Sequence, residues 1–253
     1  MKNLINTVIV LISCYYAYSQ EIQTNCKIVY DFNISLDGTP KNYKSTLFSN
    51  QKQSIFFWND QMSEKNTEES GELGNVSIKV NINDSIGTIN KTDFEKDSLF
   101  TRTVWIKGET YIIKEKKPKL NWTLHEQQKY IGDLLSTKAT CEFRGRSYTA
   151  WYATSIPIPF GPWKLHGLPG VILEARDSKG EVEFLVESIN IPHSQNIQDL
   201  SRSGKTISLK NYVEKRGKLV NSIVKSIKGK LPRGATVEVN ETEVNHLEFF
   251  PNK

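Results

Sequence analysis

The order of hydrophobic and polar residues along the chain predicts a series of short strands. Alternation with a period of two, which a half-buried strand requires, recurs between residues 27 and 190. In Glu181–Asn190, for example, Val182 and Phe184 fall on one face, and Glu181 and Glu183 fall on the other. This alternation is typical of an antiparallel sheet with one face in water. The predicted strands are Lys27–Ile34, Tyr43–Phe48, Gln53–Trp58, Val76–Val80, Phe100–Ile106, Glu109–Lys114, Trp122–Tyr130 (a strand and a turn), Thr137–Arg144, Arg146–Tyr152, Val171–Arg176, Glu181–Asn190, Thr236–Asn240 and His246–Phe250.

One segment has helical periodicity instead. Between Leu209 and Lys228, apolar residues recur at spacings of three, four and seven, and lysines occupy the opposite face. Ser208 is the expected N-cap, and Gly229 is expected just after the end. Burial of this apolar face would be worth about 10–20 kcal/mol before entropy, so the helix should pack on the sheet. The expected fold is therefore mainly β (α+β), a curved antiparallel sheet or half-barrel with this helix packed on it.

The most constrained stretch of the chain is Gly161–Glu174, which holds three glycines, two prolines, a tryptophan and a histidine. Pro169 and Gly170 are predicted to be the central pair of a type II turn. Proline presets φ at the second position of such a turn, and glycine tolerates a positive φ at the third. Gly167 is predicted to serve a second tight bend or a close backbone approach.

The first residues have the pattern of a secretory signal peptide. Lys2 precedes an apolar run that is too short for a membrane span, and small residues predict cleavage between Ser19 and Gln20. The product would be periplasmic. The alternative is a lipoprotein, because residues 11–14 resemble a lipobox that would place a lipid on Cys14.

Charge and length change this picture little. The first nineteen residues hold one lysine and no acidic residue, so the formal charge falls from +5 to +4 on cleavage. So mild a charge fits ordinary solubility, and the alternative is a preference for anionic partners or membrane surfaces. No nucleic-acid partner is predicted. Residues 20–253 are expected to form a single domain, with the polar stretch 59–75 as a mobile surface loop.

Two cysteines remain after cleavage, Cys26 and Cys141. An even pair in an oxidising compartment suggests a disulfide. The alternative is two buried thiols whose Cα atoms are too far apart to bridge. Neither these cysteines nor the four histidines have the spacing of a metal site, so the sequence predicts no metal and no cofactor.

Candidate binding residues gather around the constrained stretch. Arg144 and Arg146 flank a predicted hairpin turn, where they would clamp a carboxylate or phosphate, or form ion pairs of the hairpin itself. His166 would act as a general base or contact a ligand, or would bond a turn carbonyl as a structural histidine. No nucleophile with a supporting acid is recognisable near it, so no catalytic residue is assigned. The remaining binding candidates are Lys164 and the aromatic residues Trp151, Phe160 and Trp163. The three aromatic side chains would line an apolar pocket or belong to the ordinary core. The core is favoured for Trp151, whereas the irregular, proline-rich chain around Phe160 and Trp163 fits a lip or lid.

The motif Gly167–Ile172 reads Gly-Leu-Pro-Gly-Val-Ile and resembles the GLPGLI family, exported proteins typical of the Bacteroidetes. Val171 stands where the family name has leucine, a swap that conserves character. The likeness is specific from about residue 120 to 190. Its other motifs are Lys138–Thr140, Phe143–Arg146, Tyr148–Tyr152, Ile156–Ile158, Gly161–Trp163 and, more weakly, Asn245–Glu248. The resemblance implies an envelope protein and supplies no activity. A more distant likeness to periplasmic lipoprotein-carrier half-barrels is an analogy of fold.

These features favour a non-enzymatic binding or chaperone-like module. It would hold an apolar or amphipathic ligand, or a partner segment, on the curved sheet, with residues 156–170 as a lip. The alternatives are a hydrolase-type enzyme centred on His166, and a structural envelope component that acts with an outer-membrane transporter. A tightly filled core with no concave apolar surface beside Trp163 would contradict the first hypothesis. An acid or nucleophile within reach of His166 would support the second, and a flat exposed apolar patch the third.

Overall fold

The computed structural model describes residues 21–36, 38, 40–59, 86–104, 109–228, 247, 248 and 250. The predicted signal peptide and lipobox, nearly all of the 59–75 loop, and the predicted strands Val76–Val80 and Thr236–Asn240 lie outside these ranges. Of the last predicted strand, His246–Phe250, residues 247, 248 and 250 are described, and none of them is in a strand. The described elements are β1 (Glu21–Thr24), β2 (Cys26–Ile34), β3 (Lys41–Ser49), β4 (Gln53–Trp58), β5 (Thr88–Asp93), β6 (Ser98–Val104), β7 (Thr110–Lys116), β8 (Thr123–Ile131), β9 (Leu134–Phe143), β10 (Arg146–Ala153), β11 (Val171–Asp177), β12 (Val182–Asn190), β13 (Gln195–Gln198), the 3-10 helix η2 (Leu200–Arg202), β14 (Lys205–Ser208) and α1 (Leu209–Lys228).

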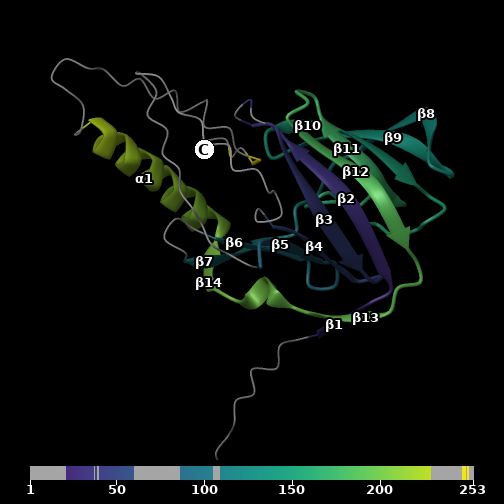
Figure 1. Cartoon of the computed structure of the whole chain (residues 1–253), viewed down its shortest axis with the longest axis horizontal. Coiled ribbons are helices and arrows are strands. Elements are labelled where there is room, and N and C mark those ends of the chain that lie inside the picture. The colour runs from purple at the N-terminus through teal and green to yellow at the C-terminus, as the bar shows by residue number, and fades with distance from the viewer. Residues whose placement is uncertain are drawn as a thin grey trace, which may run out of the picture.

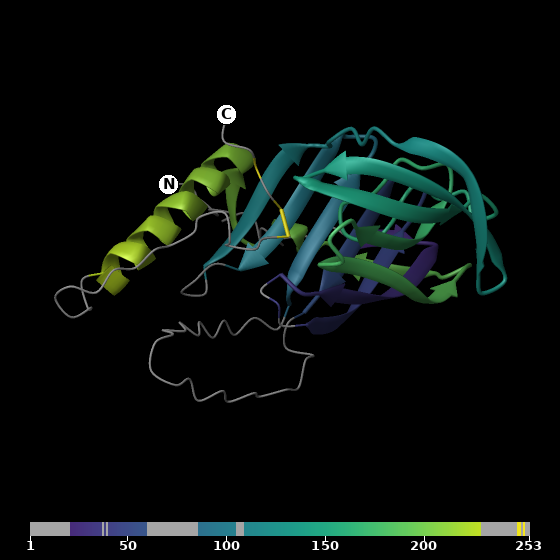
Figure 2. The same cartoon turned by 90° about the horizontal axis from the view of Figure 1, so that it is seen from above.

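Twelve of the strands form one open, curved sheet in the order β14-β7-β6-β5-β4-β3-β2-β12-β11-β10-β9-β8 (Figures 1 and 2). Neighbouring strands are antiparallel, except that β14 runs parallel to β7. The short strands β1 and β13 pair separately. The predicted fold class, mainly β with a large antiparallel sheet and one helix, is therefore confirmed.

Alternating burial along β2 shows why these segments form strands. Ile28, Tyr30 and Phe32 are buried, and the residues between them are only partly covered. Phe32 stacks on Phe184 of the neighbouring strand β12 with ring centroids 4.6 Å apart. The Tyr30 hydroxyl donates a hydrogen bond to the carbonyl oxygen of Ile172 at 2.8 Å. The apolar face of the sheet thus builds the main core.

The helix α1 begins where its periodicity predicts and is described as far as Lys228, while Gly229, expected just after its end, lies outside the described residues. Ser208 is its N-cap, because its hydroxyl oxygen accepts the backbone N–H of Asn211 at 3.2 Å. The helix meets the sheet at one edge, through β14 and β7, and extends away from it (Figures 1 and 2). It does not lie across the apolar face, because the segment after β10 already fills that place. Within the described ranges, no helix has both the length and the apolar character of a membrane span.

Candidate functional site

The constrained stretch turns differently from the prediction. Gly167 has a φ of +92°, whereas Gly170 does not have a positive φ. A Cβ atom on Gly170 would lie 2.1 Å from the carbonyl oxygen of Ala153. The predicted type II turn at Pro169 and Gly170 is therefore wrong. Gly170 is required for a close backbone approach, and Gly167 supplies the positive φ.

Phe160 and Trp163 lie in the core rather than at a lip. Phe160 is 1% exposed and Trp163 is 3% exposed. Trp163 packs against Phe143 and Tyr148, with ring centroids 5.5 and 6.1 Å away. These rings, together with Leu165 and Leu168 of the same stretch, cover the face of the sheet on which α1 was expected.

Trp151 points the other way. It is partly exposed on the opposite face of β10, and the Lys129 Nζ atom lies 4.5 Å from its ring centroid. Lys129 also forms an ion pair with Glu174 at 2.6 Å. Trp151 therefore shares no site with Phe160 and Trp163.

The two arginines of the β9–β10 hairpin are both ion-paired. Arg146 is 4% exposed, and its Nη1 atom contacts the carboxylates of Asp177 and, at 2.7 Å, Glu181. Arg144 forms an ion pair with Glu115 on β7. Lys164 is 2% exposed and forms an ion pair with Glu248, 84 residues further along the chain.

His166 is buried, and both of its ring nitrogens face backbone carbonyls. The Nδ1 atom lies 2.8 Å from the carbonyl oxygen of Lys164, and the Nε2 atom lies 3.0 Å from that of Pro118. The His166 carbonyl oxygen accepts the Trp122 indole N–H at 2.9 Å. Neither ring nitrogen is left to take a proton from a substrate, and neither contacts an acid or a nucleophile.

We expect the pKa of His166 to lie below 6.5. Burial is the largest cause of this lowering and Lys117 adds to it, while the two carbonyls act in the opposite direction. The unfolded chain therefore binds the proton more readily. The contribution of His166 to stability is full above pH 6.5 and decreases as the pH falls from 6.5 through the folded-state pKa.

An NMR titration of the histidine ring signals, assigned with a His166→Gln variant, measures this pKa directly. A midpoint above 6.5 would contradict the prediction. It would mean that the two carbonyls hold His166 as an imidazolium that donates to both.

Cys26 and Cys141 are free, buried thiols in this structure, so the disulfide that the sequence suggested is not formed. The sheet register runs from Cys141 through Tyr148 and Asp177 toward the end of β2 at Ile34. Cys26 lies at the opposite end of β2 from Ile34, about 25 Å along the strand at the usual rise per residue. A disulfide requires the two Cα atoms to lie within about 7 Å of each other. Burial raises the pKa of both thiols, that of Cys141 to about 12.

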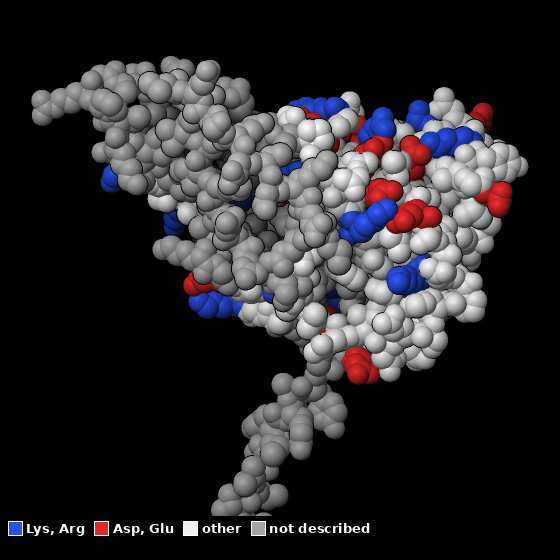
Figure 3. Space-filling model, in the orientation of Figure 1, with Lys and Arg blue, Asp and Glu red and all other residues white. Residues whose placement is uncertain are grey.

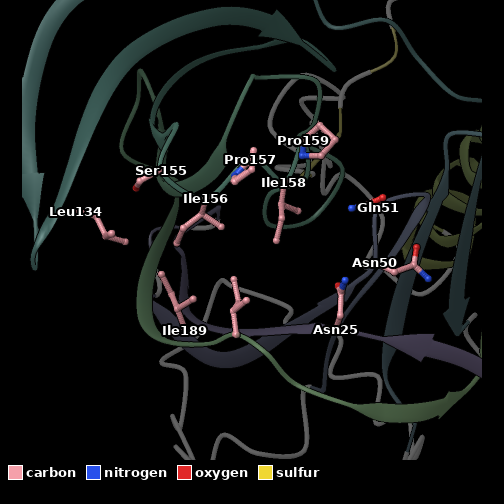
Figure 4. Close-up of a pocket in the computed structure, with 11 residues that line it drawn as sticks. Asn25, Asn50, Gln51, Leu134, Ser155, Ile156, Pro157, Ile158, Pro159 and Ile189 are labelled. Carbon is pink, nitrogen blue, oxygen red and sulfur yellow. The ribbon is translucent and has the colours of Figure 1, made fainter.

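An apolar cavity of about 750 Å³ opens at the start of the proline-rich segment. Figure 4 shows Ile156 and Ile158 facing Ile189 across the hollow, with amide side chains at its other end. None of its lining residues carries a charge. They are Asn25, Asn50, Gln51, Leu134, Ser155, Ile156, Pro157, Ile158, Pro159, Ile189 and Ile191.

The cavity uses only the first part of the predicted 156–170 lip, and none of the candidate aromatic residues lines it. The apolar hollow expected beside Trp163 lies instead beside Ile156 and Ile158, and Trp163 is packed in the core. The other walls come from the ends of β9 and β12 and from the turns that precede β2 and β4. No local sequence signal marks these walls, because only the sheet topology brings them together.

On the described face in Figure 3, basic and acidic side chains are interspersed rather than gathered by sign. No group of three or more His, Cys, Asp or Glu side chains that could hold a metal occurs among the described residues.

Comparison with known proteins adds one family match. Residues 141–174 match a family described as "Protein of unknown function (Porph_ging)". This stretch holds Arg144, Arg146 and the residues from Phe160 to His166, but only part of the cavity wall. The match fits a Bacteroidetes-type family and does not identify the GLPGLI family as such. A search of curated proteins found no match.

The fold is similar to that of a solved protein named PNGF-II. Its structure in space group P21 aligns with a TM-score of 0.54 at 13% identity over 76% of this chain. Its structure in space group C2 aligns with a TM-score of 0.52, again at 13% identity. This chain spans about a third (32%) of the PNGF-II chain. At this identity the likeness concerns the β-rich fold alone.

Proposed function

We propose that this protein is a non-enzymatic binding module that holds an uncharged apolar or amphipathic ligand in the cavity beside Ile156 and Ile158. The observation that carries this proposal is the cavity itself. It has the volume of a small-molecule site, its walls are largely isoleucine and proline, and no charge lines it.

The contacts at the two ends of the cavity suggest how a ligand lies. The apolar part of the ligand would pack between Ile156, Ile158 and Ile189. The amide side chains at the other end, including Asn25 and Gln51, offer hydrogen bonds to a neutral polar head. The surroundings of His166 weigh against the hydrolase alternative, since both ring nitrogens are directed at backbone carbonyls.

The proposal includes export to the periplasm, on the signal-peptide pattern of residues 1–19, and kinship with GLPGLI proteins, on the motif Gly167–Ile172. Native and denaturing mass spectrometry of protein purified from a Bacteroidetes envelope tests both export and binding. We expect a chain that begins at Gln20 and a bound apolar mass that leaves on denaturation. A protein that carries no bound ligand would count against the binding module. An acylated Cys14 would show that the protein is anchored to a membrane by a lipid and is not released as a free periplasmic protein.

The substitution Ile191→Asp should weaken binding of the fluorescent apolar probe N-phenyl-1-naphthylamine at least tenfold. It puts a carboxylate into the apolar wall at a side chain that is already 47% exposed, so the fold should tolerate it. The matched control is Leu124→Asp, at a side chain on β8 that is 55% exposed and lies outside the cavity. Equal probe affinity in the two variants would show that the probe binds elsewhere.

One observation favours the alternative of a structural component that acts through protein contacts. Leu124, Tyr130 and Leu135 are exposed apolar side chains on the β8–β9 hairpin, and β8 is an edge strand of the sheet. A transporter of the outer membrane would be the expected partner. Cross-linking through the Tyr130 side chain in a host envelope tests whether a transporter contacts this hairpin. A transporter that is captured equally by a Tyr130→Ser variant would exclude the surface of Leu124, Tyr130 and Leu135 as the contact.

A further inference from the structure

A second site lies apart from the cavity, where the C-terminal segment Leu247–Phe250 meets the sheet. Leu247 packs against the main core, and its carbonyl oxygen accepts the Arg146 Nε–H at 3.2 Å. Glu248 forms an ion pair with Lys164. The Phe250 ring lies between two guanidinium groups, with its centroid 4.9 Å from the Arg144 Cζ atom and 5.4 Å from that of Arg216.

The Lys164 ammonium group depends on the acid that the segment brings. Lys164 is almost fully buried, and the other carboxylate near it, that of Glu115, is 3.9 Å away and already forms an ion pair with Arg144. A buried ammonium group without a close carboxylate is strongly unfavourable. The site is therefore built to receive a carboxylate, followed two residues later by an aromatic ring over an arginine.

The chain's own segment leaves this site incompletely satisfied. Three buried polar atoms beside it, Glu115 Oε1, Arg144 Nε and Tyr148 Oη, have no hydrogen-bond partner within the described part of the chain. Trp163, which also lies here, has a positive φ of 57°. The positive φ of Arg144, 52°, belongs to the two-residue turn of the β9–β10 hairpin. Unpaired buried groups are uncommon in a settled core and call for a partner.

We infer that Lys164, Arg144, Arg146 and Arg216 form a receptor for a peptide segment in which an acidic residue precedes an aromatic residue by two positions. The segment Leu247–Phe250 is its resident ligand, and a partner protein's segment of the same chemistry takes its place. Exchange transfers the Lys164 ion pair from Glu248 to the partner's carboxylate. It also releases Leu247, Glu248 and Phe250 of this chain.

The test uses the full chain with Glu248→Gln and Phe250→Ala, which release the resident segment, and a labelled peptide of residues 245–253. We expect the peptide to bind this released variant at least tenfold more tightly than it binds the natural chain, by fluorescence anisotropy. The same peptide with Glu248→Gln should bind at least tenfold more weakly. Adding Lys164→Met to the released variant should abolish binding, whereas adding Lys129→Met, at an ion pair outside the site, should not.

Equal affinity for the charged and the neutral peptide, or no binding by a folded released variant, would overturn the inference. If the released variant does not fold, the natural chain decides alone. Excess unlabelled peptide should then raise hydrogen exchange in the chain's own residues 247, 248 and 250 at least tenfold, and unchanged exchange would overturn it. A natural chain found as a dimer held by exchanged C-terminal segments would name a second copy, not a different protein, as the partner.

Discussion

Replacing Arg146 with alanine should lower the free energy of unfolding by about 3–5 kcal/mol, because it leaves a buried carboxylate without its counter-ion. The Asp177 side chain is 1% exposed. Its Oδ1 atom accepts the backbone N–H groups of Glu181 and Val182 at 2.8 and 3.1 Å, so the carboxylate cannot turn toward water without breaking the β11–β12 turn. Urea denaturation measures the loss.

The matched control is Arg176→Ala on the adjacent strand β11. Arg176 is also paired with a glutamate, Glu183, but its side chain is 59% exposed, so its loss should cost less than about 1 kcal/mol. Arg146→Met keeps most of the volume and should be nearly as damaging as Arg146→Ala. If Arg146→Ala and Arg176→Ala cost the same, water must reach Asp177 and the burial argument fails.

Gly170→Ala should be the most damaging single-methyl change in the constrained stretch, with a loss of about 3 kcal/mol or more. The added Cβ would lie 2.1 Å from the Ala153 carbonyl oxygen and 2.8 Å from the Thr154 Cα atom, and backbone atoms cannot move aside as a flexible side chain can. Thermal denaturation of the variant, or its loss from the folded fraction, measures the effect.

Gly180→Ala is the control for this substitution, because it separates a steric clash from backbone strain. Gly180 has a φ of +68°, but no heavy atom lies within 4 Å of the position that an added Cβ would take, so only the left-handed conformation is penalised, by about 1–2 kcal/mol. A Gly170→Ala variant as stable as Gly180→Ala would show that β10 and β11 shift apart easily.

Strands with simple alternation were predictable from the sequence, and strands with buried charge were not. Gln53–Trp58 and the helix Leu209–Lys228 have the predicted bounds. The strand β5 (Thr88–Asp93) was missed because its buried face includes Lys91, which forms an ion pair with the buried Asp199, more than a hundred residues later. A lysine in a sequence predicts a solvent-exposed position. Lys91 is buried only because the distant Asp199 pairs with its charge.

The candidate site shows the same limit. The sequence identified the constrained stretch as important, and the structure places Phe160, Trp163 and Lys164 there, but inside the protein. A proline-rich segment lacks the periodicity that separates inward-facing from outward-facing positions. The same sequence pattern is therefore expected for an exposed lip of a pocket and for a segment that is buried in the core. The partners of Arg146 and Lys164 could not be assigned, since pairing depends on how β7, β11 and the C-terminal segment converge.

The central pairing of β2 with β12 also determines how early during synthesis the sheet can form. Asn33 and Glu183 lie side by side across these strands although 150 residues separate them in the sequence. At a synthesis rate of about 5–20 residues per second, β2 waits roughly 8–30 s before its partner exists. During that interval its apolar face and one hydrogen-bonding edge stay open. A chaperone that recognises unpaired strands should therefore bind the nascent chain after β2 has been synthesised and before β12 has been. It should release the chain once residue 190 has emerged.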